Sequence, residues 1–447
     1  MTFLNPPAAV LEIAEQLEEA GFEAWCVGGA VRDALLGHPH LDWDLATSAT
    51  PAQMRDLFGR RRTIPVGIDF GTVGVLDRHG TLHEVTTFRR DVRTDGRHAV
   101  VEFGASLDED LARRDFTINA VAYSPRLGEI RDPFDGRGDL QRGIVRAVGD
   151  PDARLREDRL RALRAIRFAA RFGFTMEPAT LRAIADSAPH LGRLSAERVK
   201  QELEKTLEQA ARPSSAFALW KKTGAFATLV PALSDVEDSL LDAVDCLAAP
   251  GLPRRPQRLP ARVALLFSDV QGRDVQRALE ALRFSRQETK WIVNLISRWE
   301  SVGSTIGESL MGDGSPADMA VRQWVAAIGR LDVGAFMRIA SARWAATRAR
   351  GGEAPPPNRV RALYRRMLWC AFRSGDALEL RDLAVDGDDL RHEGIPPGPW
   401  TGKILESLLD AVIEDPSRNS PEWLVREAKR RYAAIRADAG SAANGGE

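Results

Sequence analysis

The stretch AWCVGGAVRDALLGHPHLDWD, residues 24–44, decides the fold of the N-terminal part of the chain. An apolar run typical of a strand ends at Gly28 and Gly29, and Val31 to Leu36 show the pattern of a helix. Such a strand–turn–helix unit brings backbone N–H groups and a helix N-terminus close to phosphate. Arg32 is either a bidentate phosphate donor or an arginine on the helix surface. The sequence contains neither a P-loop nor a GxGxxG fingerprint.

The end of this stretch carries two carboxylates, Asp42 and Asp44. Residues i and i+2 of a strand project to the same side, so the two carboxylates are expected to lie together. Adjacent carboxylates repel each other and are costly to bury without a cation. Glu84, inside the β-prone run LHEVTTF, supplies a third. The set predicts a Mg²⁺ site for two-metal, in-line nucleotidyl transfer. The alternative is a solvated turn beside an exposed strand position.

Short β-prone runs continue through roughly the first 150 residues and predict an N-terminal α/β head in an α+β chain. These runs are FEAWCVGGAV, TVGVLD, LHEVTTF, HAVVEF, INAVAYS and EIRDPF. After Pro151 the pattern becomes helical and stays so to the end of the chain. GGEAPPP, residues 351–357, is the clearest linker. The final residues, ADAGSAANGGE, are expected to be disordered.

The chain has 447 residues with 62 Lys+Arg and 63 Asp+Glu, a formal net charge of −1 and an ordinary globular composition. This balance argues against a general polyanion binder but leaves room for local basic surfaces. Cys26, Cys246 and Cys370 show no CxxC spacing, which favours a reducing compartment. The N-terminus lacks the pattern of a signal peptide, and no run of about 18 apolar residues occurs. These features predict a soluble cytoplasmic protein without a membrane span.

Six motifs in sequence order resemble those of the class II tRNA nucleotidyltransferases (CCA-adding enzymes) and the related bacterial poly(A) polymerases. They span residues 21–207 and read GGAVRDALLG, DWDLAT, EVTTFR, ARRDFTINAVAY, REDRLRALRAIRFAARFGF and LSAERVKQELEKTL. The resemblance implies a nucleotidyltransferase head of the polymerase β type, followed by an all-α neck, body and tail. We therefore expect a catalytic head over 1–150, a neck over 151–212, a body over 213–350, a tRNA-binding tail over 355–437 and a disordered end over 438–447.

The resemblance also implies roles for individual residues. Asp42 and Asp44 would bind the catalytic metal ions, assisted by Glu84. The sugar and triphosphate would be held by residues of the glycine turn and of the RRDFTINA motif, namely Gly28, Gly29, Arg32, Arg114, Asp115 and Asn119. The neck would recognise the incoming base through Asp158 and Arg161, with Arg164 and Arg167 nearby.

Helical geometry supports such a base-recognition site. On a continuous helix Glu157, Asp158, Arg161 and Arg164 fall on one side, and apolar residues fall roughly opposite. A carboxylate acceptor beside a guanidinium donor can pair with N4 and N3 of cytosine or with N6 and N1 of adenine. Uracil and guanine do not offer that pattern on the same edge. The alternative is a solvated helix face stabilised by i,i+3 and i,i+4 salt bridges.

These observations predict addition of CCA to the 3′ end of tRNA from CTP and ATP, by a monomer or homodimer, without a nucleic-acid template. The stretch IPVGIDFGTV, residues 64–73, resembles the form found in tRNA nucleotidyltransferases, so poly(A) polymerase activity is the weaker alternative. A flexible loop expected over residues 88–98 argues against an enzyme that adds only CC. An enzyme that adds only A remains an alternative.

Overall fold

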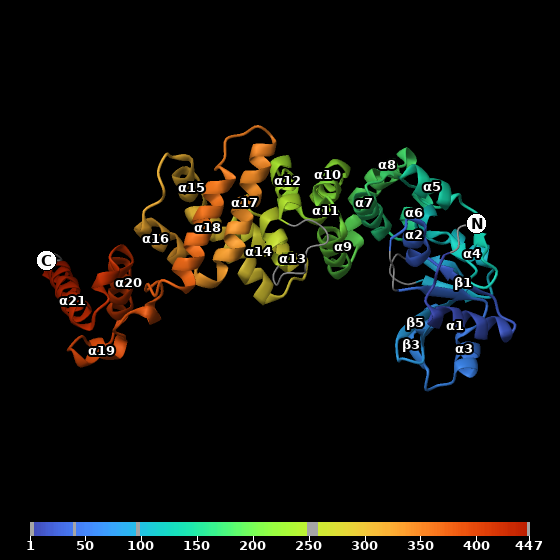
Figure 1. Cartoon of the computed structure of the whole chain (residues 1–447), viewed down its shortest axis with the longest axis horizontal. Coiled ribbons are helices and arrows are strands. Elements are labelled where there is room, and N and C mark those ends of the chain that lie inside the picture. Colours follow the sequence, from blue (N-terminus) through green and yellow to red (C-terminus); the bar gives the residue numbers. More distant parts are fainter. Residues whose placement is uncertain (1–3, 39–41, 95–98, 248–257, 445–447) are drawn as a thin grey trace. The chain divides into compact units, whose positions relative to one another are not determined.

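The computed structural model describes residues 4–38, 42–94, 99–247 and 258–444 (Figure 1). The chain forms two compact units, Met1–Asp235 with Ala281–Arg283, and Val236–Glu280 with Phe284–Glu447. The first unit contains a mixed β-sheet followed by helices, and the second unit is helical. The predicted α+β class is confirmed. The finer division into head, neck, body and tail stays a prediction.

Seven strands form the sheet of the first unit, in the order β3-β4-β5-β2-β1-β8-β9. Their bounds are Ala24–Val27 (β1), Asp44–Thr47 (β2), Thr63–Gly67 (β3), Thr72–Leu76 (β4), Leu82–Thr87 (β5), Ala122–Tyr123 (β8) and Ile130–Arg131 (β9). Neighbouring strands are antiparallel, except that β2 runs parallel to β5. Each of the six predicted β-prone runs contains a strand, and HAVVEF contains β7 (Ala99–Phe103), which pairs with β6 (Arg89–Thr94). Part of the expected loop over 88–98, residues 95–98, lies outside the described residues.

One face of this sheet packs against α1 (Ala8–Glu19) and α3 (Pro51–Phe58). Helix α1 forms because its apolar residues recur at helical spacing and lie on one face. The core that results includes Leu17 of α1, Met54 of α3 and Val85 of β5, all with an exposed fraction of 0%. Burial of each such large side chain stabilises the fold by about 1.5–3 kcal/mol. This packing fixes which strand residues point away from α1 and α3.

The opposite face of the sheet carries the candidate functional residues. Successive strand residues alternate between faces, so Asp44 and Glu84 lie on this side, away from Leu45 and Val85. Helix α4 (Leu107–Ala112) covers part of this face, in a second apolar core built around β1 and β2. Strand β3 is one edge of the sheet, and β4 and β5 follow it before β2.

Further helices complete the first unit. They are α2 (Gly29–Leu35), α5 (Gly136–Arg142), α6 (Pro151–Glu157), α7 (Leu160–Phe172), α8 (Pro178–Ser187), α9 (Ala196–Gln209), α10 (Pro213–Thr223) and α11 (Ala225–Leu229). Helices α9 and α10 both pack against α7. The short strands β10 (Ile144–Val145) and β11 (Thr175–Met176) pair in parallel beside α7. Helix α10, assigned to the body from the sequence, thus packs within the same unit as the neck.

The second unit consists of helices. They are α12 (Asp238–Cys246), α13 (Arg258–Leu266), α14 (Gly272–Ala281), α15 (Arg286–Met311), α16 (Asp318–Ile328), α17 (Val333–Ala349), α18 (Pro357–Phe372), α19 (Gly387–His392), α20 (Pro399–Glu414) and α21 (Pro421–Asn444). The predicted linker over 351–357 joins α17 to α18, and these helices pack against each other. Helix α21 continues to Asn444, whereas disorder was expected from 438, because its alanine-rich end favours helix.

The three cysteines are free, with Cys26 and Cys370 buried and Cys246 exposed. Among the residues that the structure describes, no helix combines the length and the apolar character needed to cross a bilayer.

The close approach of α5 to the 3₁₀ turn Thr117–Asn119 depends on Gly136. A Cβ added there would lie 2.1 Å from the backbone oxygen of Thr117. We expect Gly136→Ala to destabilise the protein by about 3 kcal/mol, because backbone must move to relieve the overlap. Urea denaturation followed by circular dichroism measures this loss. Gly192→Ala is the control, since its Cβ would meet only Cγ2 of Thr228 at 3.8 Å. Equal midpoints for the two variants would contradict the packing argument.

Candidate active site

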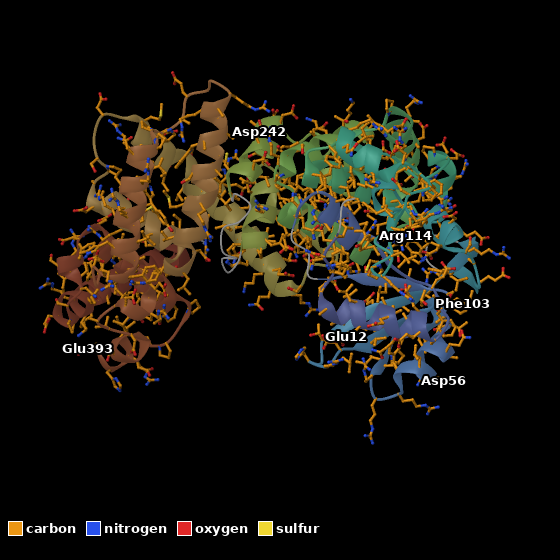
Figure 2. All side chains as sticks on the ribbon, turned by 45° about the vertical axis from the view of Figure 1, so that its right-hand side comes forward. Glu12, Asp56, Phe103, Arg114, Asp242 and Glu393 are labelled. Atoms are coloured by element: carbon orange, nitrogen blue, oxygen red, sulfur yellow. The ribbon has the colours of Figure 1, made fainter. Side chains whose placement is uncertain are left out.

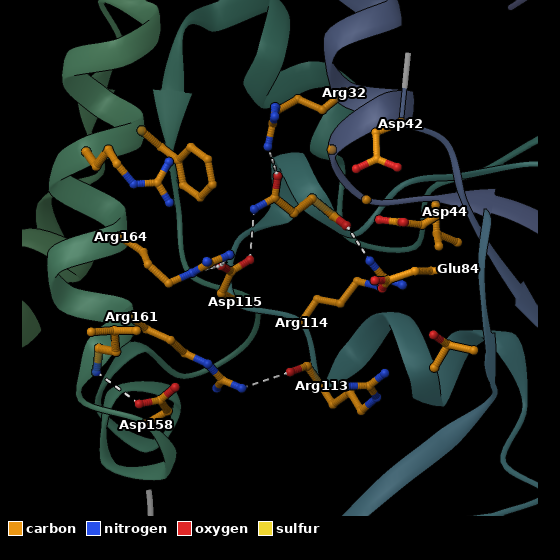
Figure 3. Close-up of a pocket in the computed structure, with 18 of the residues that line it drawn as sticks. Arg32, Asp42, Asp44, Glu84, Arg113, Arg114, Asp115, Asp158, Arg161 and Arg164 are labelled. Carbon is orange, nitrogen blue, oxygen red and sulfur yellow. Dashed lines mark hydrogen bonds and ion pairs between the residues drawn. The ribbon is translucent and has the colours of Figure 1, made fainter. Parts of the chain in front are cut away.

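A cavity of about 770 Å³ lies between the sheet and the helices α2, α7 and α9 of the first unit (Figure 3). All thirteen residues selected from the sequence line it, namely Gly28, Gly29, Arg32, Asp42, Asp44, Glu84, Arg114, Asp115, Asn119, Asp158, Arg161, Arg164 and Arg167. Figure 2 shows Arg114 within a dense group of side chains, whereas Asp56 lies at the outside of the head. The sequence therefore identified one site and not several scattered groups.

The carboxylates lie at the sheet side of the cavity. Leu45 of β2 pairs with Val85 of β5, so the preceding residues, Asp44 and Glu84, lie side by side on neighbouring strands. Asp42 precedes β2 and points into the same cavity (Figure 3). Burial, together with the charges of Asp42 and Glu84, raises the pKa of Asp44 to about 6, although Arg114 acts in the opposite direction. The three carboxylates are therefore close enough to repel one another.

These residues fit a divalent cation. Carboxylate oxygens are the hard donors that Mg²⁺ prefers, and a cation between them would remove the repulsion felt by Asp44. In the part of the chain that the structure describes, no group of three or more His, Cys, Asp or Glu side chains can hold a metal ion by itself. The arrangement thus suits a cation that completes its shell with water and substrate phosphate, and not a closed structural site.

The glycine turn brings Arg114 next to the backbone at the start of α2. Gly28 has φ = 74°, a left-handed conformation that favours glycine. A Cβ at this position would also lie 3.1 Å from Nη1 of Arg114. Arg114 is anchored on its other side by Asp110, with Nη2 and Oδ2 3.2 Å apart. In Figure 3 its guanidinium lies between Asp115 and Glu84, where a phosphate bound near the carboxylates would find it.

A chain of polar contacts links α2 to α7 across the cavity. Nη1 of Arg32 donates to Oδ1 of Asn119 at 2.6 Å, and Nδ2 of Asn119 donates to Oδ1 of Asp115 at 2.9 Å. Nε of Arg164 donates to the other Asp115 oxygen at 2.9 Å. Burial would raise the pKa of Asp115, but Arg164 and Asn119 outweigh this effect and hold the pKa below its usual range. Asp115 is therefore an ionised carboxylate that holds two parts of the site together.

Arg32 is more enclosed than the sequence suggested. Only 4% of it is exposed, and its guanidinium also pairs with Asp33 at 2.7 Å. It lies over the rings of Phe168 and Phe172, with 5.0 and 4.9 Å between the guanidinium carbon and the ring centroids. The side chain positions α2 against α7. Its direct contact with phosphate stays a prediction.

The helix assumed to continue through residues 157–164 is interrupted, and that part of the prediction is wrong. Helix α6 ends at Glu157 and α7 begins at Leu160, whereas Asp158 has the extended angles φ −148° and ψ 107°. The cause is local, because Oδ1 of Asp158 accepts a hydrogen bond from the N–H of Leu160 at 3.0 Å and so replaces a helical carbonyl. Asp158 nevertheless lines the cavity, as does Arg161.

Asp158 and Arg161 are not paired with each other. Oδ2 of Asp158 forms an ion pair with Arg198 of α9 at 2.6 Å. Nη1 of Arg161 contacts Glu157 at 2.6 Å, and its Nη2 donates to the backbone oxygen of Arg113 at 3.1 Å. Arg198 and the Arg113 carbonyl thus orient the two predicted base-recognition side chains (Figure 3).

The arginines of α7 surround two phenylalanine rings. Guanidinium carbons lie within 4.4 to 5.5 Å of the Phe168 or Phe172 centroid, and they belong to Arg164, Arg167 and Arg171. Arg167 is 4% exposed and also pairs with the buried Glu202 of α9 at 2.6 Å. Part of the basic character of this helix is therefore used to pack the neck, and the nucleotide contact predicted for Arg167 stays a prediction.

Sequence reasoning missed several residues that line the cavity. They are Thr72, Thr86, Arg113, Arg198, Lys205 and Gln209. The last three lie on α9, inside the LSAERVKQELEKTL motif that carried part of the resemblance. Their spacing of seven and four residues, at positions 198, 205 and 209, places them on one helix face and was a usable signal.

Three segments match known families. Residues 24–146 match the "Poly A polymerase head domain". Residues 173–236 match the "Probable RNA and SrmB-binding site of polymerase A". Residues 368–428 match domain 2 of tRNA nucleotidyltransferases. The first match contains the carboxylates and the glycine turn, and the second contains α9.

Several relatives match over almost the whole chain. A CCA-adding enzyme of Limosilactobacillus fermentum is 35% identical over 422 residues, which cover 93% of this chain and 95% of the relative. That of Geobacillus stearothermophilus is 34% identical over 444 residues, covering 96% and 99%. The crystal structure of the Bacillus stearothermophilus CCA-adding enzyme in complex with CTP superposes with a TM-score of 0.72 at 32% identity, over 96% of this chain and 98% of that one. The chain therefore belongs to the family of CCA-adding enzymes, which are tRNA nucleotidyltransferases.

Proposed function

We propose that this protein adds C, C and A to the 3′ end of tRNA, using CTP and ATP and releasing pyrophosphate. The observation that carries the proposal is the single cavity with carboxylates at its sheet side and a carboxylate–guanidinium set on the neck helices. The whole-length relatives named CCA-adding enzymes support it, and one of them was solved with CTP. Addition of A alone would use the same site and is the alternative.

Asp42 and Asp44 would hold the cation, which we take to be Mg²⁺, and Glu84 lies beside them to assist. The ion, when bound, would supply positive charge to the reacting phosphate and lower the pKa of the attacking hydroxyl. The chain itself supplies further positive charge, since Arg114 reaches the same end of the cavity. The 3′-hydroxyl of the RNA attacks the α-phosphate, a new phosphodiester bond forms, and the bond to pyrophosphate breaks.

The base of the nucleotide would lie at the neck. Asp158 presents an acceptor and Arg161 a donor, the pattern that cytosine and adenine share on their Watson–Crick edges. Both side chains already have protein partners, Arg198 for Asp158 and Glu157 for Arg161. These partners already hold the two side chains in place before a base binds. The side chains would therefore lose little rotamer entropy when they contact the base. The helices of the second unit would contact the rest of the tRNA.

Product sizing tests the proposed function. We expect a tRNA that ends at the discriminator base to gain two nucleotides with radiolabelled CTP alone and three when ATP is added. Electrophoresis at single-nucleotide resolution reads the result. Growth with ATP only on tRNA that already ends in CC would establish the A-only alternative. Long adenosine tracts would establish a poly(A) polymerase.

Asp42→Ala should lower nucleotide addition by about a thousandfold or more, because the site loses a cation ligand worth several kcal/mol to the transition state. The thermal unfolding temperature should change little, since Asp42 lies on an exposed loop position. Asp56→Ala is the matched control, as Asp56 is exposed on α3 at the outside of the head (Figure 2). Incorporation assays compare the two variants, and retained turnover in Asp42→Ala would refute the metal assignment.

Asp158→Ala should relax the choice of base more than it weakens nucleotide binding. Loss of the acceptor for the exocyclic amine should reduce the preference for CTP over UTP, measured as a ratio of kcat/KM, by about 10- to 100-fold. Arg161→Ala should act in the same direction. The control is Asp152→Ala, which removes an exposed carboxylate from α6. An unchanged CTP-to-UTP ratio in both site variants would show that the base is recognised elsewhere.

A further inference from the structure

An exposed apolar surface lies on the sheet beside the carboxylates. Ile64 and Val66 of β3 are 42% and 46% exposed, and Leu82 of β5 is 37% exposed. We call these three residues the β3–β5 apolar surface. Exposed side chains of this kind gathered in one place mark a binding surface more often than scattered ones do. None of the three lines the nucleotide cavity.

This surface is on the same face of the sheet as the catalytic carboxylates. Leu82 and Glu84 are two residues apart in β5, where exposed and buried residues alternate. Gly74 of β4 pairs with Glu84 on one side and with Ile64 on the other. Asp44, Glu84, Gly74 and Ile64 therefore follow one another across β2, β5, β4 and β3.

Gly74 leaves room for two of these side chains to approach each other. A Cβ at Gly74 would lie 2.6 Å from Cδ1 of Leu82 and 2.9 Å from Cγ2 of Val66. Leu82 and Val66 thus approach Gly74 from the two neighbouring strands and occupy the space that the side chain of a larger residue would need. The result is a continuous apolar floor that ends at Glu84, and not three isolated side chains.

The β3–β5 apolar surface lies where the RNA acceptor, the substrate that has no position yet, would be expected. The proposed base site lies on the neck and the triphosphate lies near Arg114, so the incoming nucleotide extends from α7 to the carboxylates. In an in-line displacement the attacking hydroxyl approaches the α-phosphate from the side opposite the leaving pyrophosphate. Strands β5, β4 and β3 lie beyond β2 in the sheet order, and they carry the apolar floor from Glu84 to the sheet edge.

We propose that the β3–β5 apolar surface holds the 3′-terminal nucleotide of the RNA acceptor and directs its hydroxyl towards Glu84. This inference rests on the proposed function. Arg60 and Arg61, both exposed, lie shortly before β3 and provide positive charge at the sheet edge where the preceding phosphates of the RNA would lie. An RNA end meets both demands, since it offers sugar and base faces to the floor and phosphates to the edge.

The chemistry of the floor also suits the reaction. Aliphatic side chains bind the face of a base or sugar by contact area and offer no donor or acceptor that distinguishes one base from another. The acceptor of a CCA-adding reaction ends in a different nucleotide at each step, namely the discriminator base, then C, then C. A floor without hydrogen-bonding groups accepts all three, while base selection remains with Asp158 and Arg161.

The test is the double variant Val66→Ser and Leu82→Ser, assayed with tRNA lacking CCA, with tRNA ending in C and with tRNA ending in CC. We expect the KM for each RNA to rise by about five- to tenfold, because contact area is lost whatever the terminal base. The KM for CTP and the affinity for CTP in calorimetry should match the wild type, which also verifies folding. Leu82→Met, which preserves apolar contact, should keep the wild-type KM for RNA.

Leu127→Ser is the matched control. Leu127 is 64% exposed and lies between β8 and β9, at the sheet edge opposite β3, so its loss should leave every KM unchanged. If the double variant fails to bind CTP, Val66→Thr carries the test, because it keeps the shape of the side chain on an exposed edge strand, and a rise of about two- to threefold in the KM for RNA is expected.

Two outcomes overturn the proposal while leaving the proposed function intact. One is a wild-type KM for RNA in the double variant, or in Val66→Thr where that variant carries the test. The other is a rise confined to a single terminal base, which would indicate a base-specific site. A wild-type protein that incorporates neither CTP nor ATP would instead refute the proposed function itself.

Discussion

The ion pair between Asp115 and Arg164 is the interaction on which the site depends. Asp115 belongs to the head and Arg164 to the first long neck helix, and they meet with 2.8 Å between Nη2 and Oδ2. The carboxylate also accepts hydrogen bonds from the backbone of Phe116 and from Asn119, at 2.9 Å each. Removal of one partner would leave a buried charge uncompensated, which costs about 3–5 kcal/mol. This contact helps to fix the position of α7, and with it the distance between the carboxylates and the base site that we propose on the neck.

The net charge of the chain does not reveal the charged groups that line its cavity. The chain carries a formal net charge of −1, yet its cavity combines three carboxylates at its sheet side with a row of arginines on the neck. The two groups face each other across a space that would be filled by a negatively charged triphosphate and its cation. Phe168 and Phe172 allow several guanidinium groups to stay close together, because each ring attracts a cation on its face. Local arrangement, and not net charge, decides what this protein can bind.

Much of the site was predictable because its signals are local. Gly28, Asp42, Asp44 and Glu84 lie in short strand or turn motifs. Asp42 precedes β2 and is not part of it, so the strand alternation invoked for Asp42 and Asp44 does not apply, yet both line the cavity as expected. Strand β3 was not among the predicted runs. It contains Pro65, which has no N–H to donate, but at a sheet edge the missing N–H costs nothing. Similarly, the linker over 351–357 has the composition of a domain boundary, yet the helices on either side of it pack together.

The remaining errors concern partners that are distant in sequence. A 3.6-residue period cannot show that the Asp158 side chain bonds to the next residue but one and so ends the helical hydrogen bonding. Nor does it show that Asp158 pairs with Arg198, 40 residues away, or that Arg161 contacts the carbonyl of Arg113, 48 residues away. Such pairings depend on how helices pack, which is a property of the tertiary fold and not of the local pattern.

The ion pair between Arg171 and Asp33 joins residues separated by 138 positions, at 3.0 Å. It has a consequence for the protein during its synthesis. The head leaves the ribosome first, with its sheet and its carboxylates, but the arginines that complete the cavity follow only when α7 and α9 have emerged. Bringing residues 33 and 171 together costs chain entropy, and the contacts that α7 makes with the head must offset that cost. A nascent chain that stops before the neck would therefore present the carboxylates that we propose to be catalytic without the proposed base site, and nucleotide selection would begin only when the neck docks.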